Sequence, residues 1–244
     1  MPRRIALVLA IVGGAALLAL LLYSVGWLHL SYPDRTRYTV RGIDVSHHQG
    51  VIDWQRVAKT RVRFAYLKAS EGGDWRDESF GANLQGAKSN GLAVGAYHFF
   101  TFCAPGGVQA RSFLELAPPD VTDLPPAVDL EYVGNCAARP QAGVFARELR
   151  AFLRIIEARY HATPVLYTTQ TFFDVYLKDE EFARYPLWFR DLTGLAALPK
   201  KRTVLFRQFA DNGSVDGVKR LVDEDLFMGS SVEFEQLLAN RRPR

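Results

Sequence analysis

Two carboxylates stand two residues apart at the end of an apolar run that opens with a double proline. The segment 125–132 reads PPAVDLEY, so the acidic residues are Asp129 and Glu131. Because side chains of a strand alternate between its faces, both carboxylates are expected on one face. Their repulsion raises the pKa of one of them, and a protonated acid beside an ionised partner is what cleavage of a glycosidic bond requires. Taken alone, the pair also fits a solvated strand end.

The pair lies in one of eight short apolar runs, most of which end in polar or aromatic-polar residues. Near-continuous apolar runs are typical of strands buried on both faces, as in a parallel sheet. Polar residues at the carboxyl ends of parallel strands are where barrel enzymes build their active sites. The runs cover residues 42–50, 64–72, 92–100, 125–132, 163–169, 185–191, 203–209 and 220–227.

Helical periodicity separates several of these runs. Residues 78–90 carry apolar side chains at helical spacing, and Gly91 follows as a helix end. Residues 108–116 show a similar period, and 142–160 carry the widest apolar stripe. The second half leaves little room for long helices, with one short turn at 170–176. The sequence therefore predicts an α/β fold, an irregular (β/α) TIM-like barrel with eight strands and an incomplete set of helices.

Five of the polar strand ends match the motifs of one known family, in the same order. They are the segments 44–50 (DVSHHQG), 68–72 (KASEG), 95–99 (GAYHF), 129–131 (DLE) and 222–223 (VD). With these motifs the chain resembles glycoside hydrolase family 25, the N-acetylmuramidase lysozymes that cut peptidoglycan between N-acetylmuramic acid and N-acetylglucosamine. The resemblance runs from about Gly42 to about Leu238 and implies an irregular α/β barrel that lacks some helices.

The resemblance also implies a role for each acidic residue. Glu131 is the general acid that protonates the leaving glycosidic oxygen, and Asp129 stabilises positive charge or the substrate's acetamido group. Asp44 and Asp223 come from opposite ends of the sequence and complete an acidic floor only if the barrel closes. The positions that match the sugar-lining residues of the family, where aromatic faces stack on pyranose rings, are Lys68, Tyr97, Tyr167 and Trp188.

The chain departs from the family pattern in three places. Residues 188–192 read WFRDL where Trp-x-Ala-x-Tyr is frequent, and 207–209 read RQF where Trp-Gln-Tyr is frequent. Asp225 stands where Asn is frequent. Because the four carboxylates are all present, we expect these departures to change the glycan length or side groups that are accepted, and to leave catalysis in place.

Several of these residues also fit structural roles, which the sequence leaves open. Lys68 could pair with Glu71, and Asp223 could belong to a solvated acidic turn with its neighbours at 224–225. The adjacent pair His47–His48 makes a poor metal site, because neighbouring side chains of an extended segment point to opposite faces. The aromatic residues that could simply pack in the core are Tyr97, Tyr167 and Trp188.

Two classes of function fit the chain: a membrane-anchored lysozyme and, as the alternative, a non-catalytic barrel that binds cell-wall glycan. The presence of both Asp129 and Glu131 favours the enzyme. A chitinase-like barrel would need Asp in place of Leu124 and Ala127. The sequence contains no glycine-rich phosphate loop and no evident cluster of metal ligands, so we expect neither a cofactor nor a metal.

An uncharged apolar stretch occupies residues 5–28, directly after Arg3 and Arg4. About 20 apolar residues are enough to cross a bilayer, whereas the apolar core of a signal peptide has about 7–15. Residues 24–26 form a poor cleavage site, because two large apolar residues follow them. We therefore predict an uncleaved signal anchor, with secretion after signal-peptide cleavage as the alternative.

The predicted order of the chain is a cytoplasmic end at residues 1–4, a membrane span at 5–28, a tether at 29–41 and a catalytic barrel at 42–240. Arginines lie on both sides of the span, so charge does not set its orientation. A peptidoglycan substrate places the barrel on the periplasmic or extracellular side of the inner (cytoplasmic) membrane. We expect glycan strands and the membrane as partners, and a monomer.

The charge of the chain gives no sign of a nucleic-acid partner. The formal net charge is +4, and arginines near the two ends supply more than that. The globular region is therefore close to neutral. The terminal arginines fit anionic lipid or solvent better than a nucleic-acid face.

The two cysteines, Cys103 and Cys136, each lie a few residues past a predicted strand, the third and the fourth. Neighbouring strands are about 4.8 Å apart, and a disulfide needs Cα atoms about 4.4–6.8 Å apart. We therefore predict a Cys103–Cys136 disulfide at the rim of the active-site mouth, in an exported domain where such a bond persists. Two free, buried thiols are the alternative.

Overall fold

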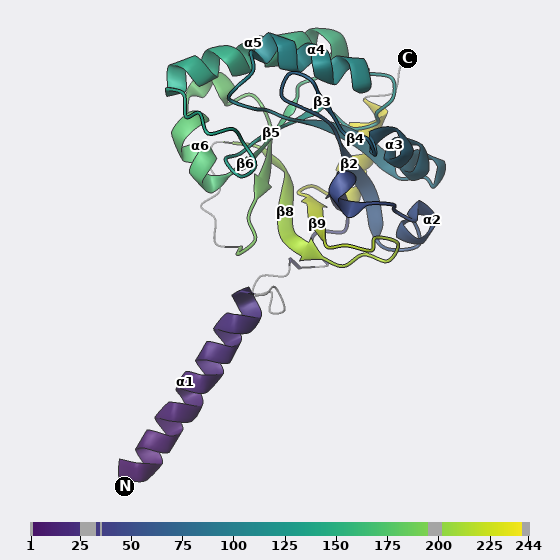
Figure 1. Cartoon of the computed structure of the whole chain (residues 1–244). Coiled ribbons are helices and arrows are strands. Elements are labelled where there is room, and N and C mark those ends of the chain that lie inside the picture. Colours follow the sequence, from purple (N-terminus) through teal and green to yellow (C-terminus); the bar gives the residue numbers. More distant parts are fainter. Residues whose placement is uncertain (1, 25–32, 35, 195–201, 241–244) are drawn as a thin grey trace.

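A computed structural model describes residues 2–24, 33–34, 36–194 and 202–240 of the chain. Within them, eight strands close into a barrel in the order β1, β9, β8, β7, β6, β5, β4, β2, and β1 pairs with β2 (Figure 1). The predicted eight-stranded barrel is therefore confirmed. The strands are β1 (Arg41–Val45), β2 (Val62–Glu71), β4 (Ala93–Phe99), β5 (Ala127–Leu130), β6 (Val165–Thr169), β7 (Leu187–Arg190), β8 (Val204–Gly213) and β9 (Val222–Phe227), and the short β3 (Trp75–Arg76) pairs with the end of β2.

The last strand differs from the all-parallel barrel that the apolar runs indicated. β9 runs antiparallel to both β8 and β1, whereas the other barrel pairs are parallel. Only residues 214–221 connect β8 to β9, and a parallel connection needs about a dozen residues or more. As a consequence, the first residues of β9, rather than its last, lie at the end of the barrel where the parallel strands finish.

The barrel interior has an aromatic layer and a polar layer, because side chains alternate along each strand. Tyr66 on β2 fills the space left by Gly95 on the neighbouring β4, where a Cβ would lie 2.3 Å from the tyrosine ring. The buried residues of the aromatic layer are Val40, Phe64, Tyr66, Tyr97, Leu124, Ala127, Val165, Tyr167, Trp188, Phe206, Phe227 and Phe234. Phe234 comes from helix α7 (Ser231–Ala239), which closes this end of the barrel.

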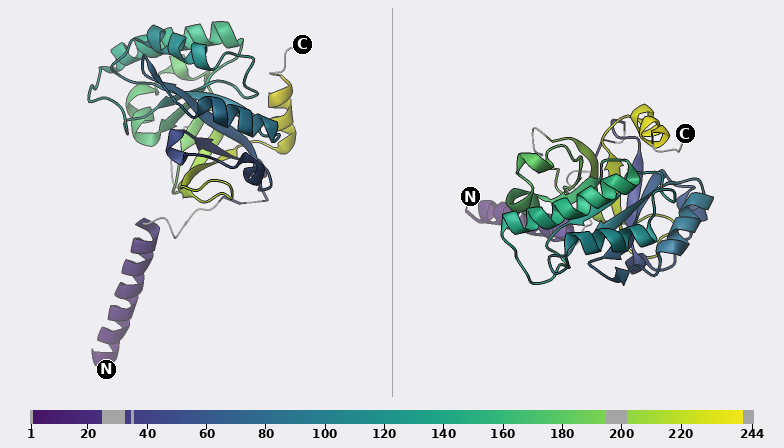
Figure 2. Two further views of the ribbon diagram at one scale, coloured as in Figure 1. Left: turned by 45° about the vertical axis from the view of Figure 1, so that its right-hand side comes forward. Right: turned by 90° about the horizontal axis from the view of Figure 1, so that it is seen from above.

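Helices cover one side of the barrel more fully than the other (Figures 1 and 2). α4 (Gly106–Leu116) and α5 (Ala142–Tyr160) lie side by side, and they come close because Gly106 has no side chain: a Cβ there would lie 1.8 Å from the Glu148 carbonyl oxygen. No α-helix occurs between β7 and β9 in the described residues, so the incomplete helix set is confirmed. The remaining elements are α2 (Trp54–Val57), α3 (Phe80–Ser89), α6 (Gln170–Tyr176) and the 3₁₀ turns at His47–Gln49 and Glu180–Phe182.

Helix α1 (Pro2–Ser24) stands apart from the barrel (Figure 1). Its apolar stretch Arg4–Leu22 has a mean hydropathy of 2.9, and none of it is buried. At 1.5 Å per residue, 23 residues give a length of about 34 Å, enough to cross a bilayer core of about 30 Å. A signal sequence has the same properties, so the structure leaves anchor and signal peptide open. Residues 25–28 of the predicted span and 29–32 and 35 of the predicted tether lie outside the described residues.

Candidate active site

All four predicted acidic residues meet at one end of the barrel. Asp44, Asp129, Glu131 and Asp223 line a hollow of about 90 Å³. The predicted Tyr97, Tyr167 and Trp188 line the same hollow, together with Gln208. The closed barrel therefore brings together residues that are up to 179 positions apart in the sequence, from Asp44 to Asp223.

Strand register explains this convergence. Asp44 on β1 lies directly opposite Asp223 on the antiparallel β9. Asp129 on β5 lies beside Tyr167 on β6. Glu131 is the first residue after β5, and it lines the same hollow as Asp129, as the two-residue spacing predicted.

A larger groove of about 460 Å³ opens from this hollow. The two spaces share Asp44, Tyr97, Asp129, Glu131 and Asp223. A polymer lying in the groove would therefore pass over the carboxylates. The groove continues along Val45, Ser46, His48, Gln49, Lys68, Glu71, Phe99, Val133 and Gly134.

Hydrogen bonds fix the floor of the hollow. The Tyr167 hydroxyl donates to Gln208 Oε1 at 3.0 Å, and Gln208 Nε2 donates to Asp44 Oδ2 at 3.0 Å. The Trp188 indole N–H donates to Asp225 Oδ1 at 2.7 Å. One carboxyl oxygen of Asp129 is buried and has no hydrogen-bond partner in the described part of the chain. Because Asp129 lines the hollow, that oxygen can interact with a ligand there.

The three aromatic residues at the floor are buried, as their structural alternative predicted. Trp188 is 2% exposed, and its ring lies 4.7 Å from the ring of Tyr66, centroid to centroid, tilted by 30°. Tyr97 and Tyr167 pack against Trp188 edge-on. All three also line the hollow, so their rings form part of its wall as well as part of the buried aromatic layer. Stacking of these rings on a sugar stays a prediction.

Burial raises the pKa of each aspartate at the floor. The pKa of Asp44 lies well above its usual range because of burial, and the charge of Asp225 raises it further. Burial and the charge of Asp44 raise the pKa of Asp223 to about 9. The pKa of Asp129 is raised by burial first and by the charge of Glu131 second. These aspartates therefore keep their protons to a higher pH than a solvated aspartate does.

The pKa of Glu131 reflects a different set of effects. Its pKa is raised by burial, while the positive charges of Arg190 and Lys68 oppose the shift. The charge of Glu131 contributes to the raised pKa of Asp129, and burial is the cause that raises the pKa of Glu131.

Lys68 combines its two predicted roles. Its ammonium group donates to Glu71 Oε2 at 2.7 Å, and it lies 4.9 Å and 4.8 Å from the ring centroids of Trp75 and Phe99. The same side chain lines the groove. It is thus a paired lysine that still brings positive charge to the acidic site.

Sequence reasoning missed several polar residues of the site. Gln208 was noted only as part of a departing motif, although it lies two residues after the inward-facing Phe206 and period 2 could have identified it. Asp225 was noted as a departure, and its bond to Trp188 was not foreseen. No group of three potential metal ligands occurs among the described side chains. His47 bonds to Asp77 at 3.0 Å instead.

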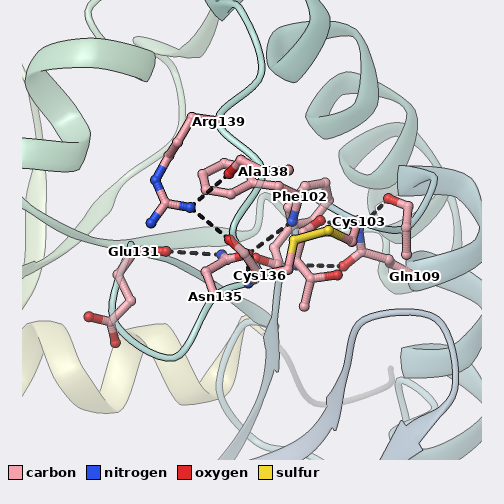
Figure 3. The surroundings of a disulfide bond; sticks show 11 residues. Phe102, Cys103, Gln109, Glu131, Asn135, Cys136, Ala138 and Arg139 are labelled. Atoms are coloured by element: carbon pink, nitrogen blue, oxygen red, sulfur yellow. Dashed lines mark hydrogen bonds between the residues drawn. A yellow bond between two sulfur atoms is a disulfide. The ribbon is translucent and has the colours of Figure 1, made fainter.

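The predicted disulfide is confirmed at the rim of this site. Cys103 and Cys136 are bonded, with their Cα atoms 6.3 Å apart. The bond joins the loop after β4 to the loop after β5, which also carries Glu131 (Figure 3).

The sequence matches a known family over most of the barrel. A model of the glycosyl hydrolases family 25 matches residues 43–218. Lysozyme M1 of Streptomyces globisporus is 33% identical over 214 aligned residues, covering 82% of this chain and 72% of the relative. The uncharacterized protein YegX of Escherichia coli (strain K12) is 34% identical over 203 aligned residues, covering 81% of this chain and 73% of the relative.

Solved structures show the same fold. A family 25 glycosyl hydrolase from Bacillus anthracis has a TM-score of 0.79 at 32% identity, covering 86% of this chain and 97% of the other. A bacterial lysozyme from Streptomyces coelicolor has a TM-score of 0.76 at 31% identity, covering 83% of this chain and 98% of the other. Both solved chains are covered almost completely, so the likeness takes in nearly the whole of each known fold.

Proposed function

Because the chain belongs to glycosyl hydrolase family 25, we propose that it is a lysozyme, an N-acetylmuramidase that hydrolyses the β-1,4 bond between N-acetylmuramic acid and N-acetylglucosamine in peptidoglycan. Family membership makes the chain a glycoside hydrolase. The observation that carries the finer proposal is the set of four carboxyl groups beneath an open groove, each with a pKa raised by burial.

In this proposal Glu131 is the general acid. It lies where the hollow and the groove meet, and burial raises its pKa, so it can keep a proton until the leaving oxygen takes it. Asp129 is the ionised partner in this proposal. Burial and then the charge of Glu131 raise the pKa of Asp129 and Lys68 lowers it, and Glu131 exerts no charge on Asp129 while it holds the proton. Its buried oxygen without a partner would stabilise developing positive charge or bind the acetamido group of the sugar.

Asp44 and Asp223 support this pair from the other side of the hollow. Asp44 is held by Gln208, and Gln208 is held by Tyr167. We propose that both aspartates hold the sugar at the catalytic pair, since they reach the same hollow from β1 and β9. Lys68 and Tyr97 would contact the glycan along the groove.

Digestion of purified peptidoglycan tests the reaction. After borohydride reduction, mass spectrometry should find the reduced muramic acid at the new chain ends. Products that end in reduced glucosamine would assign the other glycosidic bond. Binding of peptidoglycan without any soluble product would support the alternative of a non-catalytic glycan-binding barrel.

Glu131→Gln tests the acid assignment. The amide keeps the shape and cannot supply the proton, so kcat should fall by about 10²–10⁴-fold. Glu115→Gln is the matched control, because Glu115 is exposed, forms an ion pair with Arg76 at 2.7 Å, and lines neither the hollow nor the groove. Normal product release by folded Glu131→Gln protein would overturn the assignment.

We also propose that α1 anchors the enzyme in the inner membrane, with the barrel on the periplasmic or extracellular side, as a monomer. The support is the length and apolar character of the unburied Arg4–Leu22 stretch and the location of the polymer substrate. Membrane fractionation of the full chain, followed by N-terminal sequencing, should find an uncleaved membrane-bound protein. A soluble form that has lost its first 24–28 residues would favour secretion instead.

A further inference from the structure

The loop that follows β5 carries three features of the site at once. It begins with Glu131, continues through Val133 and Gly134, which line the groove, and reaches Cys136 of the disulfide. Val133 is 78% exposed, so its side chain does not hold the loop in place. The ring of Tyr132, the residue next to the acid, packs against Phe102, Phe172 and Tyr176. A polar contact of this loop holds the backbone of Glu131 in addition.

Asn135 makes most of these contacts. Its Nδ2 donates to the carbonyl oxygen of Glu131 at 3.0 Å and to that of Phe100 at 2.9 Å. Its Oδ1 accepts from the backbone N–H of Phe102 and of Cys136, each at 3.0 Å (Figure 3). One amide thus joins the acid's own backbone to the loop after β4, and it does so with both its donor and its acceptor side.

The loop after β4 is itself held from the opposite side. Gln109 of α4 accepts from the Thr101 N–H at 2.9 Å and donates to the carbonyl oxygens of Thr101 and Ala104 at 2.9 Å and 2.8 Å. Gln109 is completely buried, and its Oε1 also lies 3.0 Å from Nε2 of His98 on β4. Asn135 therefore ties Glu131 to a fixed part of the barrel.

Other contacts hold the outer part of the loop. The disulfide joins Cys136 to Cys103, and Arg139 donates to the carbonyl oxygens of Cys136 and Ala138 at 2.7 Å each. The Arg139 guanidinium also lies 5.1 Å from the ring centroid of Tyr132. None of these contacts reaches the backbone of Glu131, whereas the side chain of Asn135 does.

We propose that Asn135 is a positioning residue for Glu131, and that its Nδ2 donor sets where the acid meets the glycosidic oxygen. This inference rests on the proposed function, in which Glu131 is the acid. A displacement of about 1 Å in a catalytic group can cost about 10²-fold in rate. Loss of the amide should therefore lower kcat while substrate binding by the rest of the groove persists.

The test compares Asn135→Ala and Asn135→Asp on the full chain. Asn135→Asp keeps an acceptor for Phe102 and Cys136 and loses both donors, so both variants should lower kcat by roughly 10–100-fold with little change in KM. Asn90→Ala is the matched control: Asn90 Nδ2 donates to the Gly86 carbonyl at 2.9 Å in α3, far from the acid in the fold, and its kcat should equal that of the wild type.

The pH profile separates positioning from a merely structural role. The titratable and charged groups that interact with Glu131 are Asp129 on β5, Lys68 on β2, Arg190 on β7, Asp44 on β1, Asp223 on β9 and Tyr167 on β6. If the acid moves toward solvent, its burial falls, and the alkaline limb of kcat should shift to lower pH in Asn135→Ala.

Three results distinguish the outcomes. A lower kcat in both variants and an alkaline limb shifted to lower pH in Asn135→Ala, with Asn90→Ala unchanged, supports the positioning role. Wild-type kcat and pH profile in either folded variant, while Glu131→Gln is inactive, overturns it and leaves the proposed function standing. Activity in Glu131→Gln itself overturns both.

Discussion

The same strands present aromatic side chains at one end of the barrel interior and polar side chains at the other. On β2 the inward side chain changes from Phe64 at one end to Lys68 at the other, and on β8 it changes from Phe206 to Gln208. β9 runs the other way, from Asp223 at the site to Phe227 at the aromatic end. A step of two to four residues along a strand thus separates a packed core from a catalytic floor.

The contrast between the ends is one of free energy. The aromatic end gains from burial, at about 25 cal/mol per Å² of apolar surface removed from water. The acidic end loses stability, because burial disfavours each ionised carboxylate, as the raised pKa values of Asp44, Asp129 and Asp223 show. Substitutions at the aromatic end should therefore lower stability, and neutralisation at the acidic end should raise it while lowering activity.

The largest expected effect on folding is that of Phe234→Ala. Phe234 is 2% exposed, and its ring lies 5.2 Å from that of Phe227 and 5.7 Å from that of Phe64, centroid to centroid. Loss of a buried phenylalanine side chain costs about 3–5 kcal/mol of unfolding free energy. Denaturant unfolding should show this loss, while kcat of the folded fraction should stay at the wild-type value.

Val232→Ala on the same helix is the control. Val232 is 65% exposed, so the unfolding free energy should change by less than about 0.5 kcal/mol. A reduced kcat in folded Phe234→Ala protein would contradict the separation of the two ends.

The disulfide is an exception to this contrast between the two ends of the barrel, because it should add stability at the acidic end. Replacing Cys103 and Cys136 together by serine removes a cross-link over a sequence separation of 33 residues. The chain-entropy model gives about 3–4 kcal/mol for a loop of this size. Unfolding of the double variant should show that loss, and kcat should fall less than in Asn135→Ala, since Asn135 still holds Glu131.

Thiol counting on unreduced, denatured protein provides the chemical check. Protein isolated from the periplasm should show no titratable thiol. Two titratable thiols would contradict the disulfide and remove one support for external placement of the barrel.

The sequence predicts the acidic floor because the signal is carried by charged residues at strand ends and by a period of two. Asp129 and Glu131 are found in this way, and strand adjacency is enough to pair Cys103 with Cys136. The direction of β9 is not predictable from its apolar run, because apolar character does not encode strand direction; the short connection 214–221 was the usable signal.

The amides of the site are harder to predict. Gln208 and Asn135 carry no charge, and their partners lie far away in the sequence or are backbone groups. Helix α7 was not anticipated as the cover of the aromatic end, because its nine residues show only a short apolar pattern. What the sequence misses are therefore contacts that exist only once the barrel has closed.

The smallest expected effect on folding, and the one opposite in sign, is that of Asp223→Asn. The pKa of Asp223 is about 9 in the folded chain, raised by burial and by the charge of Asp44 from an ordinary value of 3.8. Between these two pH values the unfolded chain releases the proton that the folded chain keeps, so wild-type stability falls as pH rises through this window.

Asp223→Asn removes this contribution, and its melting temperature should exceed that of the wild type by an amount that grows from pH 5 to pH 8. A gain of about 0.5–2 kcal/mol near pH 7 is expected, with a loss of lysozyme activity. If the melting temperatures of the two proteins instead change with pH by the same amount, Asp223 is ionised at neutral pH in the folded chain, and its burial does not lower the stability of the acidic end.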